Sequence, residues 1–314
     1  TESMTHETRW PLLAVVLMVA SAACAQQPAA ECPPPEGVAL QVLGSGGPIA
    51  DDGRASSGYI VWVDGRSRVL VDAGGGTFLR FGEAGARFVD LDFVGLSHFH
   101  TDHSADFPAL LKSGNFSGRE APLPVAGPGP GGPFPGLASW LESMLGPGTG
   151  AYGYLSGYLD GSGKLVKLVT LEIDRDTTTP VEVLDGEITI DALPVPHGIV
   201  PALGFRVTVG DASIVFASDQ NGSSDDFTDF ASDASVLVMH LPVPEEATGT
   251  ALQLHARPGR VASIAAEAGA GTLVLSHFMA RSLRDLDANV DVVRKGYDGA
   301  IVIASDLACI VVTD

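Results

Sequence analysis

Basic residues are scarce in this chain of 314 residues. Lysine and arginine together number 18, against 38 aspartates and glutamates, which gives a formal net charge of −20. Proteins hold nucleic acids mainly through lysine and arginine contacts to phosphates. The composition therefore argues against a nucleic-acid partner and favours a small-molecule substrate.

The sequence also lacks a long apolar run. Residues 12–20 form an apolar stretch that is too short to span a membrane comfortably. Arg9 precedes this stretch and Ala23-Cys24-Ala25 follows it as a small-residue cleavage site, so we interpret residues 1–25 as a signal peptide. The mature protein is then expected to be exported, either periplasmic or secreted. Because Ser21-Ala-Ala-Cys24 resembles a bacterial lipobox, a lipid anchor at Cys24 is the alternative, and it would be the protein's link to a membrane.

Cysteine is rare as well, with three residues in the chain. Removal of the signal peptide would leave Cys32 and Cys309 in an oxidising compartment, where disulfides persist. We hypothesise that these two cysteines pair and tie the start of the mature chain to its last strand. Two unrelated thiols are the alternative.

Glycine and proline, by contrast, are abundant, with 38 and 21 residues. Residues 26–37 form a proline-rich leader. No linker divides residues 38–314 into two cores, so we predict a single α/β domain there. Residues 113–165 lose their periodicity except for a predicted helix over residues 137–145. We interpret this segment as an inserted lid that faces the substrate, with a plain surface loop as the alternative.

Short apolar or alternating runs bounded by turn residues predict a strand-rich domain. Strands are expected over residues 38–43, 58–63, 68–72, 165–173, 181–184, 187–194, 203–209, 213–217, 234–239, 272–275, 300–305 and 309–312. Helices are expected over residues 260–268 and 281–294, and a helical pattern covers residues 105–111. Turns at Asp64-Gly65 and Gly210-Asp211 predict two hairpins.

Metal-competent side chains gather at the ends of these predicted strands. The motif His98-Phe-His100-Thr-Asp102-His103 follows a short apolar run, and two histidines two residues apart project to the same side of an extended chain. Three more such residues end later strands: His197, Asp219 and His277. A rigid sheet edge can hold ligands to the tolerance that metals require. An isolated histidine at a strand end is usually structural, so it is the joint pattern that indicates a site.

Seven nitrogen and oxygen ligands without a thiolate suit two divalent cations. Zn²⁺ is the first candidate, with Mn²⁺ or Fe as alternatives. Two such ions could share a hydroxide as the nucleophile and hold the attacked group between them. We predict that one ion binds His98, His100 and His197, that the other binds Asp102, His103 and His277, and that Asp219 bridges them. Asp102 is also counted among the catalytic residues, and Asp72 is expected to orient a ligand through a hydrogen bond.

The order of these motifs resembles the metallo-β-lactamase superfamily, and within it the ribonuclease Z or phosphodiesterase-like branch. The matching blocks are the motif at residues 98–103, His197-Gly-Ile-Val-Pro-Ala-Leu-Gly-Phe-Arg, Ile214-Val-Phe-Ala-Ser-Asp219 and Leu275-Ser-His277-Phe278. The resemblance extends from about residue 38 to the C-terminus and leaves residues 113–185 unmatched. It implies an α/β (α+β) fold, specifically a four-layer αβ/βα sandwich, with a binuclear site.

The same branch places a histidine before a helix, 22 residues ahead of its last ligand, which is the separation of His255 from His277. The resemblance therefore implies that His255 protonates the leaving oxygen. The branch usually carries His-Glu where this chain has His240-Leu241, and His-Ser-Thr where it has His255-Ala-Arg257. Without that glutamate and without a basic arm to grip tRNA, we expect a substrate other than tRNA. We interpret His240 as structural, with a place in the pocket lining as the alternative.

Together these observations predict an exported, binuclear, metal-dependent hydrolase that cleaves a small phosphodiester or a related ester through a metal-bridging hydroxide. An arylsulfatase or a lactonase on the same scaffold is the second hypothesis, because a fold does not fix a substrate. A binding protein that keeps the fold without turnover is the third, and the intact set of predicted ligands argues against it. Nothing in the sequence indicates an oligomeric state.

Overall fold

The computed structural model describes residues 32–312. The predicted signal peptide, the candidate lipid-anchor residue Cys24 and residues 26–31 of the proline-rich leader lie outside the described residues. Within the described part of the chain, no helix combines the length and the apolar character that a membrane crossing needs.

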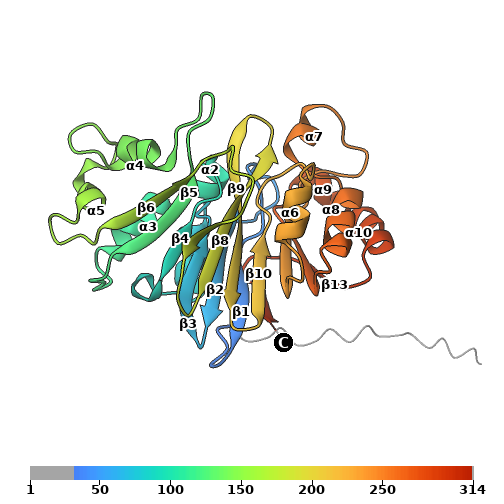
Figure 1. The fold of residues 1–314 in the computed structure, drawn as a ribbon, viewed down its shortest axis with the longest axis horizontal. Helices are drawn as coiled ribbons and strands as arrows, with labels where there is room; N and C mark the ends of the chain where they lie inside the picture. The colour runs from blue at the N-terminus through green and yellow to red at the C-terminus, as the bar shows by residue number, and fades with distance from the viewer. Residues whose placement is uncertain (1–31, 313–314) are drawn as a thin grey trace, which may run out of the picture.

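Two seven-stranded sheets face each other at the centre of the molecule (Figure 1). In spatial order, the first sheet contains β14 (Cys309–Val312), β1 (Val38–Gly44), β2 (Gly58–Val63), β3 (Arg66–Val71), β4 (Phe93–Gly95), β5 (Leu123–Pro128) and β6 (Leu168–Ile173). The second sheet contains β13 (Ala300–Ile303), β12 (Thr272–Ser276), β11 (Val236–His240), β10 (Ala212–Phe216), β9 (Val200–Val209), β8 (Thr189–His197) and β7 (Val181–Leu184). Both sheets are mixed, since the hairpin strands pair antiparallel and the strands after a crossover pair parallel.

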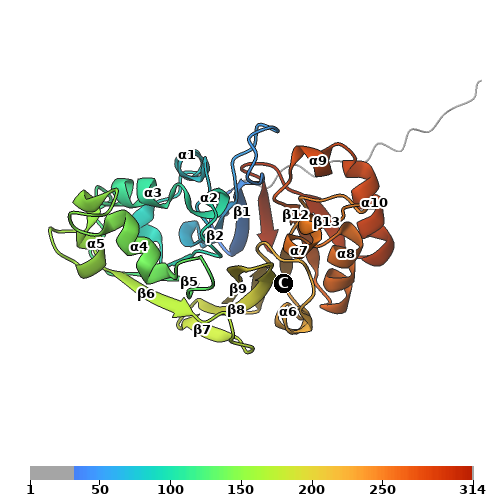
Figure 2. The ribbon, with the colours of Figure 1, turned by 90° about the horizontal axis from the view of Figure 1, so that it is seen from above.

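Helices form the two outer layers (Figure 2). The first sheet is flanked by α1 (Thr77–Glu83), α2 (Thr101–Ser104), α3 (Phe107–Gly114), α4 (Leu137–Leu145) and α5 (Gly157–Asp160), with two 3₁₀ turns, η1 (Phe88–Asp90) and η2 (Gly153–Leu155). The second sheet is flanked by α6 (Asp225–Phe230), α7 (Thr250–Leu254), α8 (Pro258–Glu267), α9 (Ala280–Leu283) and α10 (Leu286–Gly296). The predicted four-layer αβ/βα sandwich is therefore confirmed.

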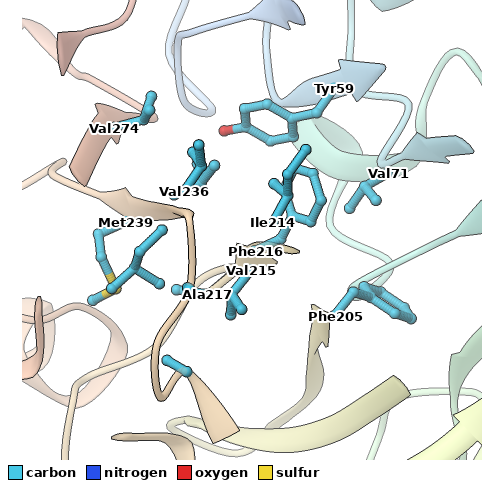
Figure 3. Close-up of a cluster of buried hydrophobic side chains, with 14 of the residues drawn as sticks. Tyr59, Val71, Phe205, Ile214, Val215, Phe216, Ala217, Val236, Met239 and Val274 are labelled. Carbon is cyan, nitrogen blue, oxygen red and sulfur yellow. The ribbon is translucent and has the colours of Figure 1, made fainter. Parts of the chain in front are cut away.

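The main core lies between the two sheets (Figure 3). Tyr59 of the first sheet packs against Phe216 of the second, with ring centroids 5.5 Å apart. Along β1, Leu40 and Val42 belong to this core, whereas Ala39 and Leu43 belong to the outer core on the other face of the sheet. Burial on both faces explains why such strands have continuous apolar sequences rather than alternating ones. The two sheets are thereby locked together, which fixes the strand ends relative to one another.

Residues 113–165 are more regular than their glycine- and proline-rich sequence indicated. Within this segment β5 pairs in parallel with both β4 and β6. The predicted helix over residues 137–145 is confirmed as α4, and it buries Leu137, Leu141 and Leu145 against the first sheet's outer core. The interpretation as a lid is therefore wrong for β5 and α4, because neighbouring strands and helices supply the burial that local periodicity does not reveal.

Other predicted boundaries also shift. The helix expected over residues 281–294 is two helices, α9 and α10, separated at Arg284-Asp285, where Asp285 leaves the helical region with φ −121° and ψ 37°. Helices α1 and α6 were not predicted, because each is too short for its periodicity to stand out in the sequence. The strands of the second half otherwise lie within a few residues of their predicted positions.

A disulfide joins Cys32 to Cys309, with a Cα–Cα distance of 5.8 Å. The predicted pairing is confirmed. Cys309 begins β14, which lies beside β1 in the first sheet, so the bond ties the leader to the edge of the sheet that begins the domain. It closes a loop with a sequence separation of 277 residues, and the chain-entropy model assigns such a loop on the order of 5–6 kcal/mol of stabilisation.

Candidate metal centre

Every histidine among the described residues belongs to one cluster, where strands from both sheets end. The seven rings are those of His98, His100, His103, His197, His240, His255 and His277. Neighbouring ring centroids are as little as 4.1 Å apart, for example between His98 and His103. A single buried histidine usually has a structural role, but seven imidazole rings in one cluster indicate a ligand-binding site.

The residues of this cluster lie at or just after the ends of different strands. His98 follows β4 within three residues, and Asp102 and His103 lie on α2. From the second sheet, His197 is the last residue of β8 and His277 follows β12 directly. Sequence segments nearly 180 residues apart meet here only because the two sheets pack face to face.

Three non-glycine residues at these strand ends adopt left-handed backbone conformations. They are Asp72, Ser218 and His277, with φ values of 60°, 56° and 55°. Such conformations cost of order 1 kcal/mol or more and persist where the surrounding structure imposes them, often at functional sites. The backbone is therefore turned so that Asp72, Asp219 and His277 present their side chains to the cluster.

The carboxylate of Asp219 lies at the centre. Its Oδ2 is 3.6 Å from Nε2 of both His103 and His197, and 4.0 Å from Nε2 of His98. Its Oδ1 is 3.4 Å from Nε2 of His277. Asp219 thus faces residues of both predicted ligand groups, the arrangement expected of a bridging carboxylate.

The first group contains His98, His100 and His197 together with Asp219, and one potential ligand atom from each lies within 4.8 Å of the others. Nδ1 of His197 donates to the carbonyl of Leu254 at 2.9 Å, which leaves Nε2 unprotonated. That Nε2 is buried and has no hydrogen-bond partner. A buried lone pair without a donor fits a metal ion, and a second ring nitrogen held by a carbonyl is the usual support for a ligating histidine.

The second group contains His103, His240 and His277 with Asp219, and one potential ligand atom from each again lies within 4.8 Å of the others. Nε2 of His103 and Nε2 of His277 are only 3.2 Å apart, so a proton or a cation must separate their lone pairs. Oδ2 of Asp102 lies 3.1 Å from Nε2 of His277 and 3.6 Å from Nε2 of His103. The predicted residues Asp102, His103 and His277 are therefore in mutual contact.

The structure places His240 in this centre, where the sequence favoured a structural role and left a place in the pocket lining as the alternative. Its Nδ1 lies 2.7 Å from Oδ1 of Asp219, and its Nε2 lies 3.1 Å from the hydroxyl of Tyr59. Both nitrogens are thus engaged, and the ring holds the central carboxylate in place. Its position at the end of β11, like that of His197 at the end of β8, is the signal that could have placed it in the site.

Asp72 supports the second group. Its carboxylate accepts hydrogen bonds from the N–H and the hydroxyl of Ser97, at 2.7 and 2.8 Å. Its Oδ2 also lies 2.7 Å from Nδ1 of His103. Proton sharing at Nδ1 leaves Nε2 of His103 directed at the cluster, as expected for a carboxylate that orients a ligand.

His255, the predicted proton donor, lies at the rim of the cluster. Its Nδ1 is 3.7 Å from Oδ1 of Asp219, and its ring centroid is 5.5 Å from that of His197. Burial lowers the pKa of His255 to about 3, against the smaller opposing effect of the Asp219 charge. The ring is therefore neutral at pH 7 and carries one N–H.

The protonation states of His98 and Asp219 match what a metal requires, whereas Asp72 and Asp102 hold the pKa of His103 above its usual value despite burial, so that ring must lose a proton when a metal binds. Burial, followed by the charges of His103 and His197, holds the pKa of His98 well below its usual value. For Asp219 burial by itself would raise the pKa, but the neighbouring His277, His255 and His103 hold it well below its usual value. Neutral imidazoles around an ionised carboxylate are the forms that bind divalent metals.

The chain is similar to known proteins in both sequence and fold. A family model described as Beta-lactamase superfamily domain matches residues 67–278. The chain is 31% identical over 252 residues to Ribonuclease Z of Mycobacterium bovis (strain BCG / Pasteur 1173P2), a match that spans 76% of this chain and 85% of the relative. Solved structures that share its fold include the metallo-β-lactamase fold protein YhfI from Bacillus subtilis (TM-score 0.68, 23% identity, 87% of this chain and 98% of that chain). Human tRNase Z, short form, is another (TM-score 0.69, 19% identity, 88% of this chain and 100% of that chain).

These findings correct one prediction. The low number of basic residues argued against a nucleic-acid partner, but the relatives carry the name Ribonuclease Z and a neighbour in fold is a tRNase Z. The expectation that excluded nucleic acid is therefore wrong. Net charge is a sum over the whole chain, whereas contact with a phosphate depends only on the groups beside the site.

The matched residues 67–278 contain the entire candidate centre, from Asp72 to His277. The metal-dependent hydrolase class expected from the sequence is confirmed by the family match and the relatives. The chain belongs to the β-lactamase superfamily, as a metal-dependent hydrolase with relatives among the ribonuclease Z enzymes.

Proposed function

We propose that this protein hydrolyses phosphodiester bonds of ribonucleotides at a binuclear metal centre. The observation that carries the proposal is the pair of ligand groups that share Asp219. One carboxylate shared by two sets of nitrogen ligands is suited to binding a pair of divalent ions. Such a pair can stabilise both the attacking and the leaving oxygen in phosphoryl transfer. The ribonuclease Z relatives support the choice of bond.

We assign the ligands from the contacts of each side chain. His98, His100 and His197 would hold one ion, and Asp219 would bridge to the second. His103 and His277 would hold the second ion with Asp102, whose carboxylate already contacts both. His240 is the alternative to Asp102, but its two nitrogens are occupied by Asp219 and Tyr59, so we assign it the positioning of the bridge.

Zn²⁺ is the proposed metal, because five histidines and two carboxylates without a thiolate form a donor set of borderline character. When bound, the two ions would supply Lewis acidity that activates water and neutralises charge on the phosphoryl group. The chain's own contribution is to keep the imidazoles of His98, His100 and His197 neutral and the carboxylates of Asp102 and Asp219 ionised in a buried site.

Delivery of a proton to the leaving oxygen is assigned to His255. It is buried beside Asp219 and is not one of the assigned ligands, and the form that donates is the imidazolium, which the Asp219 charge favours against the opposing effect of burial. A general acid of this kind typically contributes 10²–10⁴-fold to rate. His255→Gln, which keeps hydrogen bonding but not proton transfer, should therefore lose activity by about that factor while retaining bound metal.

The proposal includes export of the protein. Its support is the apolar segment with a small-residue cleavage site and the Cys32–Cys309 disulfide, a bond that persists mainly in oxidising compartments. Expression of the full chain in a bacterial host, with mass spectrometry of the N-terminus, tests it. Cleavage before Gln26 supports soluble export, acylated Cys24 supports the lipid anchor, and an uncleaved cytoplasmic chain contradicts both.

Activity is tested with purified protein on a single-stranded RNA oligonucleotide, bis(p-nitrophenyl) phosphate, p-nitrophenyl sulfate and an aryl lactone. We expect chelator-sensitive hydrolysis of the two phosphodiesters that Zn²⁺ restores. Asp219→Asn should abolish it and lower the metal content, whereas the exposed control Asp291→Asn should do neither. Turnover of the sulfate or the lactone alone would move the function to the arylsulfatase or lactonase hypothesis. Metal binding without turnover of any substrate would favour a binding protein.

A further inference from the structure

We propose that the cavity beside His255 is a leaving-group subsite in which Arg257 binds a second anionic group of the substrate. The substrate class is therefore a phosphodiester whose departing alcohol carries a further phosphate. This inference rests on the proposed phosphodiesterase function and on the place of His255 in it.

A cavity of about 330 Å³ adjoins the metal centre on the side of α7 and α8. Its walls include His255, Arg257, Arg260, Asn221 and Glu245. His255 also faces Asp219 at 3.7 Å, so one imidazole borders both the centre and this cavity. An alcohol that departs toward His255 would enter the space that Arg257 lines.

Arg257 is held in place without being neutralised. Its Nε and Nη2 donate to the carbonyl of Ala247 at 3.2 and 2.7 Å. In the part of the chain that the structure describes, Arg257 forms no ion pair, although acidic residues outnumber basic ones more than twofold. A guanidinium fixed by a neutral carbonyl keeps its charge and its remaining N–H groups for a phosphate.

The other cation of the cavity is already paired, whereas its one carboxylate, that of Glu245, is hydrogen-bonded to a backbone N–H, which does not neutralise it. Arg260 lies 3.7 Å from Asp225 and 3.5 Å from Glu267, and its Nε donates to the carbonyl of Gly222. Glu245 accepts a hydrogen bond from the N–H of Gly259 at 2.8 Å. Arg257 is thus the cation of this cavity that a ligand can engage without breaking an ion pair seen in the structure.

The chemistry balances without an additional reactant. A bond forms between water oxygen and phosphorus, the bond from phosphorus to the departing alcohol breaks, and a proton reaches that alcohol oxygen beside His255. The phosphate on the departing alcohol takes no part in this exchange. Its contact with Arg257 acts mainly on binding, so the effect should appear in KM more than in kcat.

The test uses three ribodinucleotides: one without a terminal phosphate, one with a 5′-terminal phosphate and one with a 3′-terminal phosphate. The products of the first, the adenine dinucleotide ApA, identify the departing alcohol. Release of 5′-AMP shows that the bond from phosphorus to the 3′-oxygen breaks, and release of 3′-AMP shows that the bond to the 5′-oxygen breaks. Only one phosphorylated isomer then carries its extra phosphate on the departing side. We expect the wild-type protein to prefer that isomer over the unphosphorylated dinucleotide by about tenfold in kcat/KM, chiefly through KM.

Arg257→Ala should remove this preference and Arg257→Lys should retain part of it. Arg294→Ala, which removes the same charge from the exposed face of α10, should leave the preference intact. A preference that survives in Arg257→Ala, or one for the opposite isomer, overturns the subsite while the proposed function stands. Absence of hydrolysis of all three dinucleotides and of bis(p-nitrophenyl) phosphate by the wild-type protein overturns both.

Discussion

Oδ2 of Asp72 lies 2.7 Å from Nδ1 of His103, while the carbonyl of His103 accepts a hydrogen bond from the N–H of Ala73 at 2.8 Å. The end of β3 and the helix α2 are therefore joined through both a side chain and the backbone. This double contact fixes the ring orientation of His103 before any ligand is present. It also places a buried carboxylate behind the centre, where it increases the basicity of the imidazole.

Replacement of Asp72 by asparagine should weaken metal binding by about 10- to 100-fold, because an amide is a poorer acceptor for the His103 proton than a carboxylate. Asparagine tolerates the left-handed backbone of this position, so the change should not add strain. Isothermal titration with Zn²⁺ gives the affinity. Asp106→Asn is the matched control, since Asp106 accepts from the N–H groups of Gly76 and Phe78 and should affect stability without changing the metal affinity.

Tyr59→Phe should lower the free energy of unfolding by about 1–2 kcal/mol, because it leaves Nε2 of the buried His240 without its partner. It should also reduce activity, since His240 positions Asp219. Urea unfolding and initial rates measure the two effects. Tyr158→Phe removes another buried hydroxyl, which donates to the carbonyl of Leu111 at 2.6 Å, and should lower stability alone. Equal activity losses in the two variants would contradict the positioning role of His240.

Acid should destabilise the metal-free protein. Burial lowers the pKa of His240 to about 4 and that of His255 to about 3, whereas both rings titrate near 6.5 in the unfolded chain. Below pH 6.5 the unfolded state binds more protons, so the free energy of unfolding falls as pH falls. The loss between pH 6.5 and 5 should be on the order of 2 kcal/mol for each of these two rings.

Other groups of the cluster modify this slope. The pKa values of His98, His100 and His197 are also lowered, mainly by burial, which adds to the acid sensitivity. His103 acts in the opposite direction, because Asp72 and Asp102 raise its pKa despite burial. Urea unfolding at pH 7 and pH 5 in a chelator measures the net slope. His255→Gln should flatten it, and a protein more stable at pH 5 than at pH 7 would refute the assignment of neutral rings.

Loss of the disulfide should cost about 5 kcal/mol of stability, because the bond closes a very long loop in the unfolded chain. The double variant Cys32→Ser and Cys309→Ser, compared with the oxidised wild type by urea unfolding, gives the value. A reducing agent should shift the wild type to the midpoint of the variant and leave the variant unchanged. The metal centre is formed by other residues, so the metal content should remain the same in both proteins.

Much of the candidate centre was visible in the sequence because strand ends can be recognised locally. The apolar runs before His98, His197 and His277 marked where each strand stops, and a polar metal-competent residue after such a run is a local signal. The disulfide was predictable for a different reason, since only two cysteines remain after the proposed signal peptide. The motifs resembled those of the metallo-β-lactamase superfamily, and that resemblance implied the four-layer fold.

The strand β5 and the role of His240 could not be predicted from such local patterns. The strand β5, Leu123–Pro128, has no clear periodicity, and its burial comes from β4 and β6 on either side. His240 looked like an ordinary residue at a strand end, and only the packing of the sheets brings its ring between Tyr59 and Asp219.

The sequence by itself determined which residues stand at the ends of strands, because that depends on neighbours along the chain. Only the tertiary structure decided which of those ends meet, which ring nitrogens stay free for a metal, and that Arg257 forms no ion pair among the described residues. These are distances between residues far apart in sequence, and they are set by the packing of two sheets whose side chains fill a shared core.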